Sequence, residues 1–412
     1  MLNNYDVITN CRICDSIKID SILNLGDQPL ANALRLSNDL TEEIYIPLEI
    51  IRCDNCTTIQ LSVNVKPEIM FKEYFWVTGT TKTATDYLEK LSNFIFERCT
   101  KKKPSLLEVG SNDGSLLKIL RNKEFGQLFG VDPAKNLVES INEPQVIFYA
   151  DFFNLDFTSN FLKLHEKVDI VVARNVFSHV PDLVNCLKGV SNVLNRDGLF
   201  VIEFHEANKI LNEIHYDSIY HEHTFYHSIK SISEAAKAAG LYPFDIELSP
   251  ISGGSYILFF SNGLKQKTPR LIEYEIKEIN SGVLTIEEWK KFARKSLENL
   301  EDIREYIKNN ETKNICGFGA SARSSTLINA IGDECSSLVG LADNNPLKQG
   351  KLSPGMHLKI LNPKNLINKD IDIVIIFPFN FENEIMSFIK DSLNWSGEIY
   401  LPLPNTPRIL TI

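Results

Sequence analysis

The densest group of side chains that could carry chemistry lies between His205 and His227, which holds five of the eight histidines. Its centre reads Tyr220-His221-Glu222-His223. Histidine titrates near neutral pH, and a neighbouring carboxylate can fix its tautomer and raise its basicity. An acid–base site is therefore favoured. Two alternatives are a zinc site, although the helical zinc motif spaces its histidines four residues apart, and histidines satisfied in a polar core.

Two Cys-x-x-Cys pairs near the start of the chain have the spacing of a metal site. They are Cys11 with Cys14 and Cys53 with Cys56. Two such turns can place four thiolates tetrahedrally around one Zn²⁺, whereas a redox pair would not require a second copy. We expect a structural zinc site, with iron as the main alternative, that stabilises a segment with little other core.

The sequence from Leu106 to Arg121 predicts a buried strand, a glycine turn and a helix. Gly110 and Gly114 permit backbone geometry that a Cβ would block. The free N–H groups at such a helix start, close to the turn, are the physical basis of nucleotide sites in doubly wound sheets. The pattern is not the dinucleotide-binding Gly-x-Gly-x-x-Gly, and Asp132 ends the next predicted strand.

A second strand and glycine turn begins near residue 314 and contains Gly317 and Gly319. The helix start that includes Arg323, together with Lys348, could cradle a phosphate and supply positive charge. A duplicated unit without a ligand is the alternative. Binding of NAD by an oxidoreductase is weaker, although Asp343 keeps it open.

Alternating strands and helices around these motifs predict an α/β fold. Strands are expected near 105–109, 128–132, 146–149, 168–173 and 198–204, and in a smaller second unit near 371–377 and 397–402. A charged helix over about 286–308 separates the two units. We expect a zinc-binding module over 1–80, a central Rossmann-like domain over 81–265 and a second Rossmann-like domain over 266–412.

Composition narrows the function classes. The chain has 412 residues, a formal charge of −10 and a pI near 5.4, which argue against a duplex nucleic-acid binder. Its apolar runs are far shorter than the roughly 20 residues that span a bilayer, and no basic-then-apolar segment opens it. We expect a cytoplasmic protein with no membrane or nucleic-acid partner, acting as a monomer.

The motifs, in this order, resemble the sugar C-methyltransferase family, whose members put a branch methyl on the ring of nucleotide-linked deoxysugars. The matching pieces are the paired cysteines, Pro29-Leu30-Ala31-Asn32, Tyr74 to Thr81, Glu108 to Gly114, Asn175 with His179-Val180-Pro181-Asp182, and Tyr220 to His223. The resemblance extends over nearly the whole chain. It implies that the central sheet is that of a class I methyltransferase.

The resemblance also implies ligands and roles. The methyl donor would be S-adenosylmethionine, bound by Glu108, Gly110, Asn112, Gly114, Asp132 and Asn175. His223 would be the catalytic base, with Tyr220, Glu222, His179 and Tyr74 in the active site. The acceptor would be a nucleotide-linked keto sugar, methylated at C-3 beside a 4-keto group and contacted by Tyr74, Thr78, Arg323, Lys348 and Ser255.

One motif departs from the family pattern. The segment from Ser252 to Ile257 matches His-Gly-Gly-Ser-x-Arg only in its centre, since Ser252 and Ile257 replace its two ends. The contacts made there, and with them the identity of the acceptor, are in doubt. An O- or N-methyltransferase and a nucleotide-sugar binder without catalysis are the alternatives.

Overall fold

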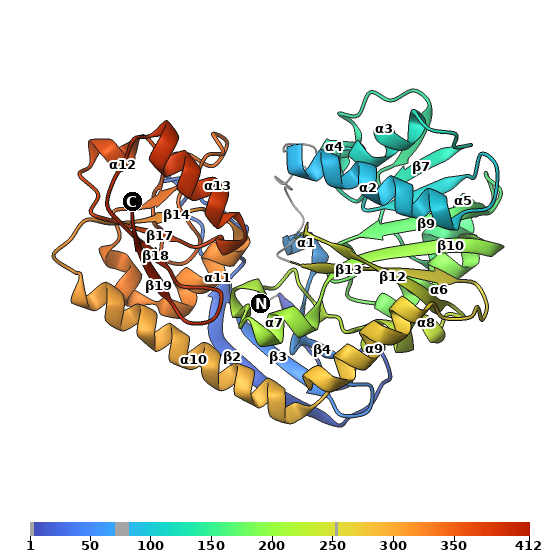
Figure 1. Ribbon diagram of the computed structural model, residues 1–412, viewed down its shortest axis with the longest axis horizontal. Coiled ribbons are helices and arrows are strands. Elements are labelled where there is room, and N and C mark those ends of the chain that lie inside the picture. Colours follow the sequence, from blue (N-terminus) through green and yellow to red (C-terminus); the bar gives the residue numbers. More distant parts are fainter. Residues whose placement is uncertain (1–3, 71–81, 252–253) are drawn as a thin grey trace.

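Figure 1 shows the chain as a computed structural model that describes residues 4–70, 82–251 and 254–412. The expected α/β class, with a small N-terminal module and two Rossmann-like sheets, is confirmed. The central sheet lies on the right of Figure 1 and the C-terminal sheet on the left. The N-terminal strands lie below and between them, in blue.

The central sheet has seven strands in the order β12-β13-β10-β9-β6-β7-β8. They are β6 (Leu106–Val109), β7 (Leu128–Val131), β8 (Val146–Tyr149), β9 (Val168–Arg174), β10 (Leu194–His205), β12 (Tyr242–Ser249) and β13 (Ser255–Ser261). All strands run in the same direction except β13, which is antiparallel to both of its neighbours, β10 and β12. The five strands expected from the sequence form this sheet, and parallel pairing brings their carboxyl ends to one edge, where ligands bind in such folds.

Helices cover both faces of this sheet, which is why its strands are apolar on both sides. The helices are α2 (Lys82–Arg98), α3 (Ser115–Arg121), α4 (Lys135–Val138), α5 (Leu155–Phe161), α6 (Leu183–Val193), α8 (Ile229–Lys237) and α9 (Pro269–Ser281). Helix α7 (Ala207–Asn212) packs instead with the N-terminal strands and the long C-terminal helix. In β9, Ile170 and Val172 pack with α2 and α3, whereas Val171 and Ala173 pack with α5, α6 and α8. A one-residue slip would exchange these faces.

The N-terminal module is built from short antiparallel strands. These are β1 (Tyr5–Val7), β2 (Ile19–Pro29), β3 (Tyr45–Cys53), β4 (Ile59–Leu61) and β5 (Val63–Val65), followed by α1 (Pro67–Met70). A distant segment, β11 (Phe225–Tyr226), completes its sheet by pairing with β4. The segment that follows the Tyr-His-Glu-His motif is thus part of the N-terminal sheet.

The C-terminal sheet has the order β16-β15-β14-β17-β18-β19, parallel except for β19. Its elements are β14 (Ile315–Phe318), α11 (Ala322–Ile331), β15 (Leu341–Ala342), β16 (Ile360–Leu361), α12 (Asn365–Asn368), β17 (Ile373–Ile376), α13 (Glu382–Ser387), β18 (Glu398–Leu401) and β19 (Arg408–Thr411). The two strands expected near 371–377 and 397–402 are β17 and β18. Both glycine turns therefore lie at the carboxyl end of the first strand of a parallel sheet.

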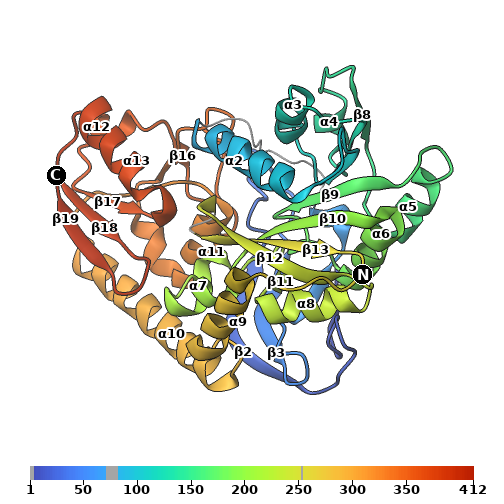
Figure 2. The same cartoon turned by 45° about the vertical axis from the view of Figure 1, so that its right-hand side comes forward.

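The long helix α10 (Ile286–Asn309) agrees closely with the helix expected over 286–308. It packs against β2, α7 and α11 and runs along the base of the molecule (Figures 1 and 2). Its buried side includes Ser296, whereas Leu297 is 52 % exposed. Among the described residues, no helix has both the length and the apolar character needed to cross a bilayer.

Candidate active site

Tyr220 and His223 form a hydrogen-bonded pair at the turn that precedes β11. The two rings lie 3.9 Å apart between centroids, and the Tyr220 hydroxyl oxygen is 2.6 Å from Nε2 of His223. Nδ1 of His223 lies 2.9 Å from the backbone oxygen of Ser218. Because a carbonyl oxygen can only accept, Nδ1 carries the proton, and in the neutral ring Nε2 accepts from Tyr220. The turn thereby presents a histidine in the tautomer that a base on Nε2 requires.

His179 completes this group from the turn after β9. Its ring lies 4.9 Å from that of His223 in an edge-on arrangement. Burial lowers the pKa of His179 to about 4 and the pKa of His223 well below its usual value, and the charge of His179 would lower the pKa of His223 further. Both rings are therefore neutral near pH 7, and Nε2 of His223 carries no proton of its own while it accepts the hydrogen bond from Tyr220.

Glu222 does not face His223, contrary to what its position in the motif suggests. Residues 221–222 form a turn rather than a strand. The carboxylate of Glu222 accepts a 2.6 Å hydrogen bond from Nδ2 of Asn32, which follows β2 in the N-terminal module. Burial raises the pKa of Glu222 to about 7. The contact gives the Pro-Leu-Ala-Asn motif a structural partner that its sequence did not reveal.

Two other histidines of the cluster have structural contacts. Nε2 of His221 donates to the backbone oxygen of Ile46 at 3.1 Å, and Nε2 of His227 donates to that of Phe177 at 3.3 Å. Within residues 4–70, 82–251 and 254–412, the four paired cysteines are the only group of three or more side chains placed to hold a metal ion. The zinc alternative for the histidine motif is thus not supported.

The four cysteines fit one tetrahedral ion. Sγ of Cys11 is 3.5 Å from Sγ of Cys56, and Sγ of Cys14 is 3.6 Å from Sγ of Cys53. Thiolates about 2.3 Å from a tetrahedral Zn²⁺ are about 3.8 Å apart, so the spacing is close to that of a zinc site. All four sulfurs lie within 4.8 Å of one another.

The turn after β6 brings the first glycine motif against the turn that carries His179. Gly110 has φ +66°, and a Cβ there would lie 2.2 Å from Val176. The side chain of Asp132 accepts from the backbone nitrogens of Asn112 and Ala134, both at 2.9 Å. The carboxylate at the end of β7 is thus held against the turn. The close approach at Gly110 puts the predicted cofactor turn next to the turn that carries His179, whose ring contacts that of His223.

Glu108 lies beneath this turn and is fully buried. Its Oε1 accepts from Nε and Nη2 of Arg174 at 3.1 and 2.9 Å, while Oε2 has no partner among the described residues. Burial raises the pKa of Glu108 to about 7 although Arg174 lowers it in part. Sequence reasoning missed Arg174 and the buried Glu203 on β10. A charged residue in or at the end of an apolar strand was the available signal.

The C-terminal turn is organised differently. Arg323 donates to Asp217 through Nε and Nη2, at 2.7 and 2.8 Å. Nζ of Lys348 donates to the backbone oxygen of Ala320 at 2.8 Å and lies 3.6 Å from Asp343. A phosphate contact for Arg323 or Lys348 stays a prediction, and sequence reasoning missed Asp217.

The remaining predicted site residues are placed as follows. Asn175 has φ +52° and directly follows β9, with its N–H donating to Glu203 O at 2.8 Å. Ser255 begins β13, donates to Ile251 O at 3.0 Å and lines a cavity of about 630 Å³. Tyr74 and Thr78 lie outside the described residues.

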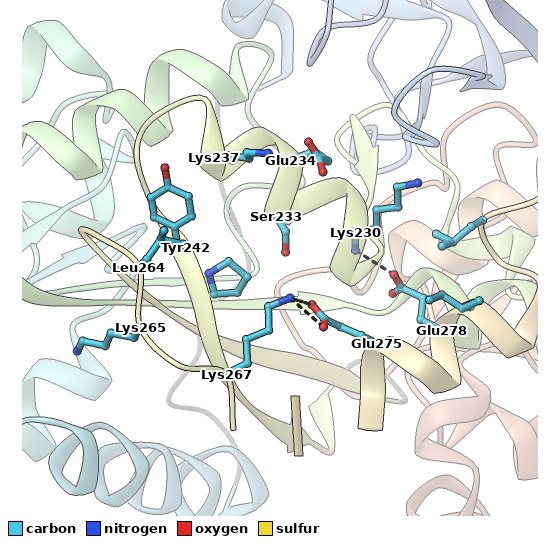
Figure 3. A pocket seen from close by; sticks show the side chains of 13 residues that line it. Lys230, Ser233, Glu234, Lys237, Tyr242, Leu264, Lys265, Lys267, Glu275 and Glu278 are labelled. Atoms are coloured by element: carbon cyan, nitrogen blue, oxygen red, sulfur yellow. Dashed lines mark hydrogen bonds and ion pairs between the residues drawn. The ribbon is translucent and has the colours of Figure 1, made fainter. Parts of the chain in front are cut away.

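A cavity of about 580 Å³ lies elsewhere, between α8, β12 and α9 (Figure 3). Three of its charged side chains have partners among its lining residues or the backbone. Lys267 pairs with Glu275 at 2.7 Å, and Glu278 accepts from the backbone nitrogens of Ile229 and Lys230 at the start of α8. No residue of the predicted site lines it.

Three protein families match the chain in consecutive segments. Residues 11–71 match a family described as a zinc binding domain, residues 81–244 match a methyltransferase domain, and residues 250–404 match a C-methyltransferase C-terminal domain. The C-methyltransferase NovU of Streptomyces niveus is 28 % identical over 410 residues, which cover 98 % of this chain and 97 % of that protein. Together these similarities identify an S-adenosylmethionine-dependent C-methyltransferase. It is an enzyme with a zinc-binding module, as the resemblance implied.

Two solved structures similar to this C-methyltransferase each cover less than half of it. A S-adenosylmethionine-dependent methyltransferase from Clostridium acetobutylicum is 14 % identical, covers 45 % of this chain and 94 % of its own, and has a TM-score of 0.35. Magnesium protoporphyrin IX methyltransferase from Synechocystis, with bound S-adenosylmethionine, is 13 % identical, covers 44 % and 80 %, and has a TM-score of 0.33.

Proposed function

We propose that this C-methyltransferase methylates C-3, beside a 4-keto group, on the ring of a nucleotide-linked deoxysugar, with His223 as the base. The observation that supports it is the pairing of Tyr220 with a His223 held in one tautomer, in contact with His179 from the turn that packs against the glycine turn. A carbon acceptor needs a base because carbon has no lone pair to offer. A hydrogen beside a ketone is acidic because its loss gives an enolate, so such a sugar suits a histidine base.

In the proposed reaction the Tyr220 hydroxyl turns its hydrogen bond from Nε2 of His223 to the ketone oxygen. Nε2 then takes the C-3 proton, and the electron pair of the broken C–H bond forms the enolate. Tyr220 and His179 are the groups placed to stabilise the oxyanion by hydrogen bonding. When bound, S-adenosylmethionine supplies a methyl group already activated by its sulfonium. C-3 then bonds to that methyl carbon as the methyl–sulfur bond breaks. Glu108, Asn112 and Asp132 would hold the cofactor so that carbon, methyl and sulfur are in line.

The sugar nucleotide would lie between the central and C-terminal parts, with Tyr74, Thr78 and Ser255 near it. In this proposal the three domains span residues 1–80, 81–265 and 266–412. The enzyme acts as a monomer in the cytoplasm. NovU is a C-methyltransferase by name, and a carbon acceptor for this chain is in line with it.

The proposal is tested in two steps. The first incubates the enzyme with labelled S-adenosylmethionine and a panel of 4-keto sugar nucleotides, and locates the label by NMR. The second replaces the cofactor by S-adenosylhomocysteine in D₂O, where a base at C-3 should exchange that proton for deuterium without methyl transfer. Label found on oxygen or nitrogen in the first step would contradict the proposal. So would a carbon that is methylated in the first step but does not exchange its hydrogen for deuterium in the second.

A further inference from the structure

The ion pair between Arg323 and Asp217 joins the C-terminal part to the turn that carries the base. Arg323 lies in the first turn of α11, and its guanidinium is also 4.5 Å from the ring centre of Phe379. Asp217 has no exposed surface, and the side chain of Arg323 is only 14 % exposed. Two parallel N–H to oxygen bonds fix both position and orientation, which a single contact would not.

The pair reaches His223 through three consecutive residues. Asp217 and Ser218 belong to one short 3₁₀ turn, η2 (Tyr216–Ser218). The oxygen of Ser218 accepts the Nδ1 proton of His223, and Ile219 O accepts from the hydroxyl of Thr326 at 3.0 Å. Helix α11 therefore binds the residue before Ser218 and the residue after it. The carbonyl that sets the tautomer of His223 is held between two contacts from the C-terminal part.

We infer that Arg323, through Asp217, is a positioning residue that fixes the carbonyl of Ser218 and with it the tautomer and orientation of His223. The inference rests on the proposed role of His223 as the base, and it assigns to Arg323 a role other than a phosphate contact. Binding a phosphate with the same two nitrogens would leave the carboxylate of Asp217 buried without a partner. Removing one member of a buried pair is strongly unfavourable, so the ion pair competes with that use of Arg323.

The test uses Arg323→Lys, which keeps the charge but cannot make two parallel hydrogen bonds. We expect kcat to fall about 10²-fold, as for a displaced catalytic group, while the affinity for a nucleoside diphosphate is unchanged. Uridine and thymidine diphosphate are the calorimetric probes, and the one that binds the wild type is used. The ¹⁵N shifts of the His223 ring, assigned with His223→Asn, should show loss of the single tautomer.

Arg98→Lys is the matched control. Arg98 on α2 pairs with the buried Asp245 at 2.8 Å, and the side chain of Arg98 is 10 % exposed. Among the described residues, no hydrogen bond or ion pair joins either residue to the turn that carries His223. This variant should lose thermal stability and keep the kcat and the His223 tautomer of the wild type. Thr326→Val is a milder second variant, since it removes only the hydroxyl that binds Ile219, and it should shift the tautomer in the same direction.

The outcomes separate this inference from the proposed function. Weaker diphosphate binding with kcat at saturation and the His223 tautomer unchanged in Arg323→Lys would overturn the inference in favour of a phosphate contact. An unchanged tautomer in both Arg323→Lys and Thr326→Val would also overturn it. If the wild type methylates no keto-sugar nucleotide, the proposed function fails, whereas the tautomer of His223 can still be measured and decides the positioning role by itself.

Discussion

The two glycine turns have the same backbone arrangement. In the central sheet Asp132 accepts from the turn nitrogen of Asn112 at 2.9 Å, and in the C-terminal sheet Asp343 accepts from Ala320 at 2.8 Å. Each aspartate also accepts from a nitrogen two residues ahead of it, at Ala134 and Asn345. The glycine pattern and the acid on the next strand therefore do not distinguish a turn that binds a ligand from one that does not.

The two turns differ in how many of their polar groups already have hydrogen-bond partners within the protein. Near the central turn, the described residues offer no partner to the buried Oε2 of Glu108 or to Oγ of Ser111, and α3 begins without a side-chain cap. At the C-terminal turn, Ser321 and Ser324 cap the start of α11 reciprocally and Lys348 binds the turn. Buried polar groups left without partners are costly, so the central turn is the one built for a ligand.

The largest expected effect comes from removing the proposed base, and it tests whether catalysis belongs to the central part of the chain. His223→Asn removes the proposed base, and we expect kcat to fall about 10²- to 10⁴-fold, the usual contribution of a general base. Binding of S-adenosylhomocysteine, measured by calorimetry, should not change, because the cofactor turn is intact. His357→Asn is the control, since this exposed histidine of the C-terminal unit pairs with Glu43 and is not one of the predicted site residues. A His223→Asn enzyme that keeps most of its rate would favour O- or N-methylation.

A matched pair of substitutions compares the two aspartates directly. Asp132→Asn should weaken S-adenosylhomocysteine binding by about 1.5–3 kcal/mol, the range for a hydrogen bond to a charged group. Asp343→Asn should leave that affinity unchanged and lower stability instead, because it removes the carboxylate charge that pairs with Lys348 and accepts from the turn nitrogens of Ala320 and Asn345. Calorimetry and thermal unfolding of both variants measure this. Equal losses of cofactor affinity would show that the two turns are not distinct in function.

The elements were predictable from the sequence because apolar periodicity follows burial on one or both faces. The strand over 106–109 and the helix over 115–121 were found at the expected residues, and so was the metal cluster, whose spacing is local. The tautomer of His223 was not predictable, because its partner is a backbone carbonyl, and every residue has one. The pairs Asn32 with Glu222 and Asp217 with Arg323 join residues 190 and 106 positions apart, which no local pattern reveals.

Acid should affect the central region before the C-terminal unit. Burial lowers the pKa of His227 to about 4, whereas His357, the C-terminal histidine, is exposed. Unfolded histidine has a pKa near 6.5, so the stability from a neutral His227 is present above that pH and is lost as pH falls toward 4. By pH 5 the loss is about 2 kcal/mol.

His227→Phe tests this acid sensitivity. The phenyl ring should keep the stacking on Phe225, and denaturant unfolding should show a smaller drop in stability from pH 7 to pH 5 than in the wild type. Comparing the two proteins at each pH cancels the opposing contribution of carboxyls whose pKa burial raises, such as Glu278. An identical pH dependence would mean that His227 is not neutral in the folded protein.

The smallest expected effect concerns the cap of α11. Ser321 accepts from the backbone nitrogen of Ser324 and thereby satisfies one of the donors that a phosphate at this helix start would use. If the C-terminal turn is a closed structural element, Ser321→Ala should lower the free energy of unfolding by about 1 kcal/mol and leave nucleoside diphosphate binding unchanged. Asn154→Ala, which removes a similar cap on α5 of the central part, is the matched control for the stability loss. If Ser321→Ala alone binds the diphosphate more tightly, the serine side chain excludes a phosphate from a site that the backbone can still form. The two turns would then differ only in that a side chain fills the C-terminal one, and not in their backbone structure.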